Sequence, residues 1–165
     1  MGMVACFAGV TAAMIDELKS DPDGVQEYLY PDDGDGEPPH YVDVDKAWHC
    51  IHFMLAGDAG MGPNPASWAF FGGEEVGEDV GYGPARILQP AQVRSIASAL
   101  SSIGESEFKA RYSPNEMLAA DVYLGDMCVR DGDDALDYIV SNYQNLVAFY
   151  RGAADRGEGA ILWLS

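Results

Sequence analysis

The sequence predicts a helix-rich, mixed α/β fold in which helices pack on a small mixed sheet. Its 165 residues, 48% of them hydrophobic, suit one domain spanning residues 1–165 around a single core. Short apolar runs near both ends, Met3–Ala8 and Ala160–Leu164, have the composition of buried strands. Between them, a long stretch repeats apolar residues at helical spacing.

The first elements are a strand, a helix and an acidic loop. We expect the strand Met3–Ala8 to end at Gly9, and Thr11 has a side chain suited to capping the helix predicted over residues 12–19. Residues 31–39 combine acidic side chains with Pro and Gly, so they predict an exposed acidic loop.

A second helix is predicted over residues 43–57, because this segment starts with aspartates and ends at a glycine. At about 100° per residue, one face of this helix is apolar and is expected to meet the core. The residues of that face are Trp48, Ile51, Met54 and Leu55. Asp45, His49 and His52 form a stripe on the other face, so we expect both histidines to lie away from the core.

Residues 57–90 are rich in Gly and Pro and are predicted to be a long irregular region, ending in a short strand at Arg86–Leu88. Pro90 then suits the first position of a helix that stops at Gly104. Ser113–Glu116 has the form of a capping box at the start of another helix.

Two short pieces, 121–124 and 127–129, are predicted to be extended on either side of Gly125. The clearest helix begins at Asp133 or Asp134 and ends near Gly152 or Gly157. Its apolar stripe is Leu136, Ile139, Val140, Tyr143, Leu146, Val147 and Tyr150. The helix from Asp133 or Asp134 to Gly152 or Gly157 is long enough to be the expected spine of the core. Ala160–Leu164 closes the chain as a buried strand.

The charge excludes several classes of partner. Nine Lys and Arg residues stand against 27 Asp and Glu, a formal charge of −18. Affinity for nucleic acids or for anionic membranes requires clustered basic residues, and here these are scattered. No apolar run is long enough to span a bilayer, and the start lacks the basic region of a secretion signal, so we expect a soluble, cytoplasmic protein.

The cysteines Cys6, Cys50 and Cys128 are odd in number and far apart, with no C-x-x-C pair. This pattern suggests neither a disulfide framework nor a thiolate zinc site, so we expect reduced and mostly buried thiols.

Several blocks of the chain resemble the YfbM-like family of small bacterial domains. They are Met1–Met3, the segment Val42–Phe53 followed by Leu55–Gly57, and Gly81–Leu88; the likeness continues through the helix at 146–151 and the last strand. The Asp-x-Asp-Lys-x-Trp and Gly-Tyr-Gly-Pro-x-Arg motifs are fairly specific when taken together. The resemblance implies a three-layer αβα-type domain and carries no established activity, so it supplies no catalytic residues. The acidic loop 31–39 is not part of the likeness.

Asp45, His49 and His52 have the spacing i, i+4 and i+7, from which three side chains could approach one metal ion. A metal would need a further ligand that nothing in the sequence fixes. We therefore favour solvated or hydrogen-bonded histidines, and we predict no metal and no cofactor.

The segment Gly81–Arg86 could bind an anion through glycine amides and the Arg86 side chain. It lacks the Lys-Ser/Thr of a phosphate loop, and Pro84 removes one amide, so we favour a turn that aims Arg86 at a carboxylate. Residues 33–37 do not form a calcium loop, because Pro38 and Val44 stand where Gly and Glu are needed.

Two functions remain open. The first is a non-enzymatic binding protein, such as an inhibitor or immunity-type protein, whose acidic surface engages a basic partner. The second is a small hydrolase or transferase with its site between the His49/His52 face and the loop that bears Tyr82 and Arg86. The candidate contact residues are therefore Asp45, His49, His52, Tyr82 and Arg86. The sequence leaves the oligomeric state open.

Overall fold

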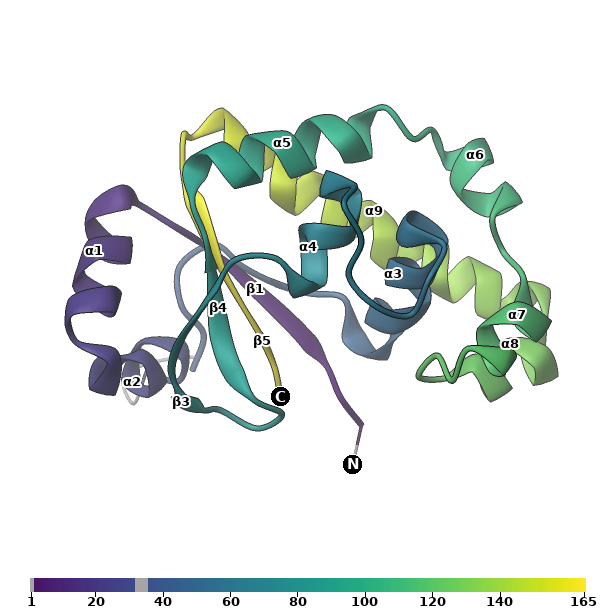
Figure 1. The fold of residues 1–165 in the computed structure, drawn as a ribbon, viewed down its shortest axis with the longest axis horizontal. Coiled ribbons are helices and arrows are strands. Elements are labelled where there is room, and N and C mark those ends of the chain that lie inside the picture. Colours follow the sequence, from purple (N-terminus) through teal and green to yellow (C-terminus); the bar gives the residue numbers. More distant parts are fainter. Residues whose placement is uncertain (1, 32–35) are drawn as a thin grey trace.

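The computed structural model describes residues 2–31 and 36–165, and it contains one five-stranded sheet (Figure 1). The strands are β1 (Ala5–Val10), β2 (Tyr41–Asp43), β3 (Glu74–Asp79), β4 (Pro84–Leu88) and β5 (Gly159–Leu164). Their order across the sheet is β2-β1-β5-β4-β3. Residues 32–35 of the predicted acidic loop lie outside the described residues.

The sheet is antiparallel at every pairing between these strands, so the expectation of a mixed sheet is wrong in this detail. The last strand, β5, lies at the centre and pairs with the first strand from Ala5↔Leu164 to Val10↔Gly159. β1 and β5 are the two apolar runs that the sequence predicts to be strands, and they are almost wholly buried. Gly9 continues β1 rather than ending it.

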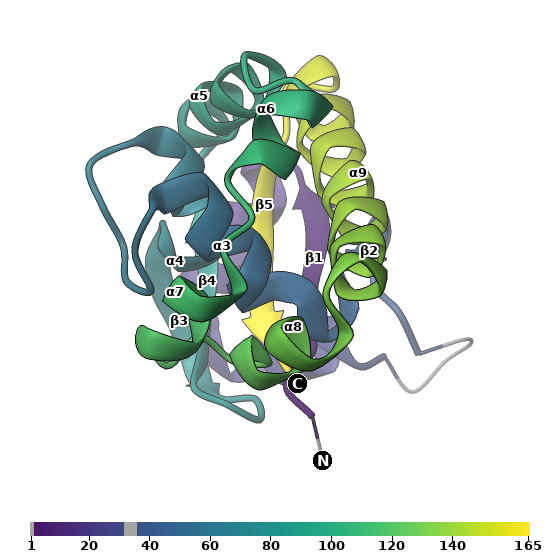
Figure 2. The same ribbon diagram turned by 90° about the vertical axis from the view of Figure 1, so that its right-hand side faces the viewer.

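Helices cover both faces of the sheet, which confirms the mixed α/β fold and its three layers (Figures 1 and 2). One face is covered by α1 (Ala12–Ser20), the 3₁₀ turn η1 (Pro22–Gly24) and α2 (Val25–Leu29). The other side carries η2 (Asp45–Ala47), α3 (Trp48–Ala56), η3 (Pro65–Ser67), α4 (Trp68–Phe71), α5 (Pro90–Ser101), α6 (Glu105–Ala110), α7 (Pro114–Ala119), α8 (Gly125–Asp131) and α9 (Asp133–Asp155).

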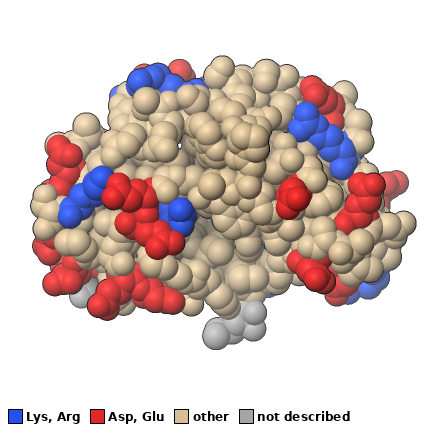
Figure 3. Space-filling model, viewed as in Figure 1, with Lys and Arg blue, Asp and Glu red and all other residues tan. Residues whose placement is uncertain are grey.

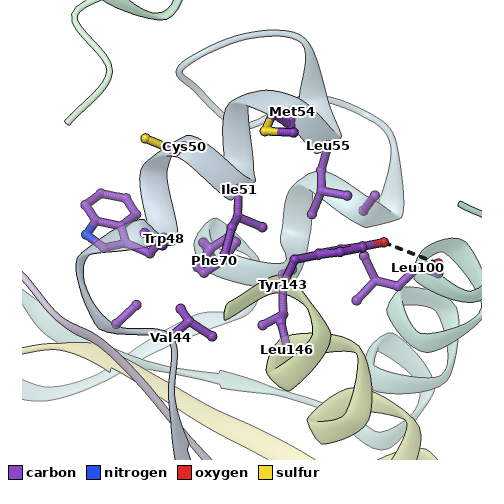
Figure 4. Packing of buried hydrophobic residues seen from close by; sticks show 14 of the residues in the cluster. Val44, Trp48, Cys50, Ile51, Met54, Leu55, Phe70, Leu100, Tyr143 and Leu146 are labelled. Atoms are coloured by element: carbon purple, nitrogen blue, oxygen red, sulfur yellow. Dashed lines mark hydrogen bonds between the residues drawn. The ribbon is translucent and has the colours of Figure 1, made fainter. Parts of the chain in front are cut away.

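The alternation of side chains along the strands builds a separate core on each face. In β1, Cys6, Ala8 and Val10 pack with α1 and α2, whereas Ala5 and Phe7 pack with the thick helical layer. The helical layer is organised around α9, the predicted spine. Figure 4 shows side chains of α3 directed toward Tyr143 and Leu146 of α9, and the Tyr143 hydroxyl donates to the Leu100 carbonyl at 3.5 Å.

Helix boundaries agree best with the sequence where a cap or a glycine fixes them. The Thr11 hydroxyl accepts a hydrogen bond from the Met14 amide at 3.2 Å, as predicted for the start of α1. Gly57 ends α3 with φ of 74°, in the left-handed region that glycine enters at little cost. α7 begins at Pro114, but the Ser113 hydroxyl makes no capping bond there, so that part of the prediction is wrong.

Two regions differ from the prediction. Residues 57–90 are not irregular throughout, because they contain η3, α4 and the antiparallel pair β3–β4. The predicted extended pieces at 121–124 and 127–129 are instead a turn followed by α8. Leu124 has a φ of 66°, so the backbone bends sharply just before α8. Gly125 allows α8 to pack close to the Leu118 backbone, because a Cβ at position 125 would lie only 3.1 Å from it. Such tertiary packing overrides the strand preference of a three-residue apolar run.

Candidate functional site

A cavity of about 160 Å³ opens at the end of the sheet where β1 begins and β5 ends. The cavity is lined by Ala5, Cys6, Phe7, Trp48, Phe70, Phe71, Glu75, Tyr82, Gly83, Pro84, Arg86, Leu162, Trp163 and Leu164. The two motifs that carry the family resemblance therefore meet here, through Trp48 from the first and Tyr82 and Arg86 from the second.

Aromatic side chains form the inner wall of the cavity. Trp48 begins α3, and its indole Nε1 donates to the Met3 carbonyl at 3.2 Å, which ties α3 to the strand entering the sheet. Phe71 of α4 meets the Trp48 ring edge to face, with ring centroids 6.0 Å apart. Tyr82 stands at the rim in the β3–β4 turn, where its side chain is 44% exposed. Gly81 and Gly83 flank it with φ of 147° and 103°, so the turn needs both glycines.

Arg86 closes one side of the cavity. Its Nη1 donates to Glu75 Oε1 at 2.9 Å, across the β3–β4 pair. Its Nε and Nη2 donate to the carbonyls of Gly72 and Gly73, each at 3.1 Å. The structure thus places Arg86 against a carboxylate, which is the arrangement favoured from the sequence. The Arg86 guanidinium also holds the backbone of the segment that leads into β3.

The predicted outward position of the histidines is wrong. His52 is fully buried and His49 is half-buried, because α3 is covered on nearly all sides by α4, α9 and the segment 57–62. The helical spacing placed them opposite the apolar stripe, but a helix buried on all sides has no solvent face.

Both histidines hold neighbouring backbone. His49 Nδ1 accepts from the Tyr123 amide at 2.9 Å, so its ring proton lies on Nε2, which donates to the Ala59 carbonyl at 3.0 Å. His52 Nε2 donates to the Gly60 carbonyl at 2.8 Å, while its buried Nδ1 has no partner among the described residues. Burial lowers the pKa of both imidazoles, so both are neutral in the folded protein near pH 7.

Neither histidine lines the cavity. Trp48 and Phe71 lie between the histidines and the cavity. The His49 ring stacks on Trp48 with centroids 4.7 Å apart, and the His52 ring packs edge to face on Phe71 with centroids 4.6 Å apart.

Asp45 lies apart from both histidines. It belongs to η2, with φ of 48°, and accepts from the Tyr138 hydroxyl of α9 at 3.0 Å. The three candidate ligands therefore do not converge on one point. Within residues 2–31 and 36–165, no group of three His, Cys, Asp or Glu side chains is placed to hold a metal ion.

A second hollow, of about 410 Å³, lies between α1 and α2. It is lined by Met14, Glu17, Leu18, Asp21, Gly24, Glu27, Tyr28, Pro31, Pro38 and Pro39. We call it the α1–α2 groove. Pro31, Pro38 and Pro39 belong to the predicted acidic loop, whereas no local pattern indicates that the side chains of α1 and α2 form a groove beside it.

Carboxylates are concentrated on the end of the molecule formed by α1, η1, α2 and β3, which we call the acidic end. The α1–α2 groove lies at this end and is lined by three of them, Glu17, Asp21 and Glu27. The exposed carboxylates of the acidic end are Asp16, Glu17, Asp21, Asp23, Glu27, Glu74, Glu75, Glu78 and Asp79. Among the described residues, ion pairs at this end involve only Glu74, with Lys19, and Glu75, with Arg86. Figure 3 shows carboxylates gathered at this end and again over α6–α8, with a largely uncharged surface between them.

None of the described helices combines the length and apolar character needed to cross a bilayer.

Comparisons with known proteins agree on a family without an assigned activity. The family model described as "Domain of unknown function (DUF1877)" matches residues 1–163. No curated protein matches the chain. Among solved structures, the crystal structure of YfbM from Escherichia coli, a protein of unknown function, superimposes with a TM-score of 0.75. The two share 20% sequence identity over 98% of this chain and 99% of YfbM, a likeness that shows the fold alone. The chain therefore belongs to the DUF1877 family, as its resemblance to YfbM-like domains predicted.

Proposed function

We propose that the protein is a non-enzymatic binding protein that engages a basic protein through its acidic end, as an inhibitor or immunity-type protein does. The α1–α2 groove is the observation that carries this proposal. Glu17, Asp21 and Glu27 rim it, and its apolar surface includes Met14 and Tyr28. A Lys or Arg side chain has matching chemistry, because its aliphatic stem packs on apolar groups while its charged head pairs with carboxylates.

The net charge supports the same kind of partner. A formal charge of −18 on 165 residues attracts cationic surfaces and repels nucleic acids and anionic membranes. We place this interaction in the cytoplasm, a reducing compartment that suits the three free cysteines.

The alternative of a small hydrolase or transferase required a histidine in a pocket with Tyr82 and Arg86. That pocket contains Tyr82 and Arg86 but neither histidine. Arg86 is already bonded to Glu75 and to two carbonyl groups. Among the described residues, neither histidine is therefore available as an acid or a base on the surface where this alternative placed it.

The experiment is affinity isolation from an extract of the native host at low and at high salt. The test variant is Glu17→Gln/Asp21→Asn/Glu27→Gln, which neutralises the rim of the α1–α2 groove. A matched control, Glu116→Gln/Asp126→Asn/Asp137→Asn, removes the same charge from the exposed surface of α7, α8 and α9. We expect the wild type and the control variant to retain a basic protein at low salt, and the groove variant to lose it.

The retained protein is then purified and titrated against all three chains. A groove variant that binds at least tenfold more weakly than the control variant supports the proposal. Retention of no basic protein at either salt concentration, or equal loss in both variants, contradicts it.

A further inference from the structure

Two cysteine side chains meet inside the helical layer, although 78 positions separate them in the sequence. Cys50 belongs to α3 and Cys128 to α8, and both are fully buried. Their Sγ atoms lie 3.6 Å apart, within hydrogen-bonding distance for two thiols. A disulfide joins two sulfurs at about 2.05 Å, so bond formation requires an approach of about 1.5 Å.

The surroundings make α8 the element that moves. The Cys50 thiol donates to the Tyr123 carbonyl at 3.3 Å, and the Tyr123 amide donates to His49. Two side chains of α3 therefore hold the backbone of Tyr123, which lies just before α8. α8 has seven residues and lies between Leu124 and Gly132, which have φ of 66° and 53°. It is therefore a short helix between two bends, and we expect it to shift toward α3 more readily than α9 or the sheet when the disulfide forms.

The two thiols differ in acidity. The contact with Cys128, together with burial, raises the pKa of Cys50, whereas the same contact lowers the pKa of Cys128. The thiolate is the reactive form, and the Cys50 proton is held by the Tyr123 carbonyl. Cys128 therefore takes the role of nucleophile, and Cys50 is the thiol that resolves the first product.

We propose that Cys50 and Cys128 are a redox modification site, which forms a reversible disulfide when local opening of α8 admits hydrogen peroxide to the buried pair. The Cys128 thiolate attacks one peroxide oxygen, the O–O bond breaks, and Cys128 becomes a sulfenic acid. The departing hydroxide takes the proton released by the thiol and leaves as water. The Cys50 sulfur then attacks the Cys128 sulfur, the S–O bond breaks, and a second water leaves with the Cys50 proton. Two thiols are oxidised and one peroxide is reduced to two waters.

Cys6 is an internal control. It is also buried, but its side chain lies on the opposite face of the sheet, near the Tyr41 and Ser165 hydroxyls at 3.5 and 3.7 Å. With no cysteine beside it among the described residues, it has no partner for an intramolecular disulfide.

The test treats the full chain with hydrogen peroxide, removes the oxidant, and alkylates free thiols after denaturation. We expect two of the three cysteines to resist alkylation, and to become reactive again after dithiothreitol. Peptide mapping should find Cys50 joined to Cys128 and Cys6 free. Amide hydrogen exchange in α8 should slow in the oxidised protein.

Variants separate this site from general oxidation. Cys50→Ser and Cys128→Ser should each lose all reversible protection, while Cys6→Ser should keep it; peptide mapping of the wild type decides the question if a serine variant does not fold. The proposal is overturned if peroxide yields sulfinic acid at Cys128 without a cross-link, a cross-link that contains Cys6, or disulfide-linked dimers.

Discussion

His49 and His52 hold two neighbouring segments against α3 through three hydrogen bonds to backbone groups. Two go to the Ala59 and Gly60 carbonyls after α3, and one comes from the Tyr123 amide before α8. Each imidazole is neutral because burial disfavours its charged form, and the bonds made by His49 require the proton on Nε2. Protonation would place a second N–H at Nδ1, where it would face the Tyr123 amide in His49 and an apolar environment in His52. Both histidines therefore stabilise the fold in their neutral form, and protonation at low pH would weaken that contribution.

The stability of the fold should fall as the pH is lowered below about 6.5, the ordinary pKa of an unfolded histidine. In the folded protein the pKa of both histidines is lower, so below that pH the unfolded chain binds more protons and is favoured. The variant His52→Gln does not titrate and keeps a donor near the Gly60 carbonyl. Urea unfolding from about pH 8 to about pH 5 should give it a flatter profile than the wild type. Parallel profiles would contradict this account of His52.

At the scale of elements, the sequence predicted those structures that one local signal determines. β5, the Thr11 cap and the long stripe of α9 fall where they were expected, and β1 lies within two residues of its predicted bounds. β3 was missed because four of its six residues are acidic, as suits an edge strand that exposes one side to water. Its position depends on pairing with β4, which no local pattern reveals.

In the candidate site, too, the sequence predicted the residues that a local motif indicates and missed those that depend on tertiary packing. Tyr82 and Arg86 were singled out from the sequence and both line the cavity, whereas Phe71 and Leu162 were not, since their roles depend on how α4 and β5 are placed. The histidines were assigned to the wrong side of α3, because helical periodicity gives the angle between side chains but not the number of neighbours around the helix.

Gly73 lies where α4 passes into β3 and determines how the two elements join. Its φ is 86°, and a Cβ there would lie 2.4 Å from the Ile87 carbonyl oxygen. Gly73→Ala should therefore reduce the free energy of unfolding by about 1–3 kcal/mol from the backbone conformation alone, and the clash with β4 adds to this loss. Chemical denaturation measures the difference.

Gly152 is the matched control, because it lies in the helical backbone of α9 and a Cβ there meets only the flexible Arg156 side chain, at 3.1 Å. Gly152→Ala should stabilise the protein by about 0.5–1 kcal/mol through helix propensity. Losses of similar size in both variants would show that the join between α4 and β3 has no special requirement for glycine.

Across the whole molecule, negative charge is the dominant electrostatic feature. Nine basic residues cannot neutralise 27 acidic ones, and most ion pairs among the described residues are on the surface, where each contributes little. Carboxylates gather at both ends of the molecule, so folding brings like charges closer together than they are in the extended chain (Figure 3). The charge proposed to attract a basic partner therefore also opposes the folded state.

Salt should relieve this repulsion, so the Tm of the isolated protein should rise as sodium chloride is added at neutral pH. Most of the increase is expected by about 0.15 M, where the screening length falls to about 8 Å. At about pH 4 many carboxylates are protonated, so the same additions should change the Tm much less. Scanning calorimetry at both pH values separates charge screening from general effects of salt on apolar burial, which persist at either pH. A Tm that falls with salt at neutral pH would mean that ion pairs outweigh repulsion, and that the carboxylates of the acidic end are held by contacts within the fold rather than available to a partner.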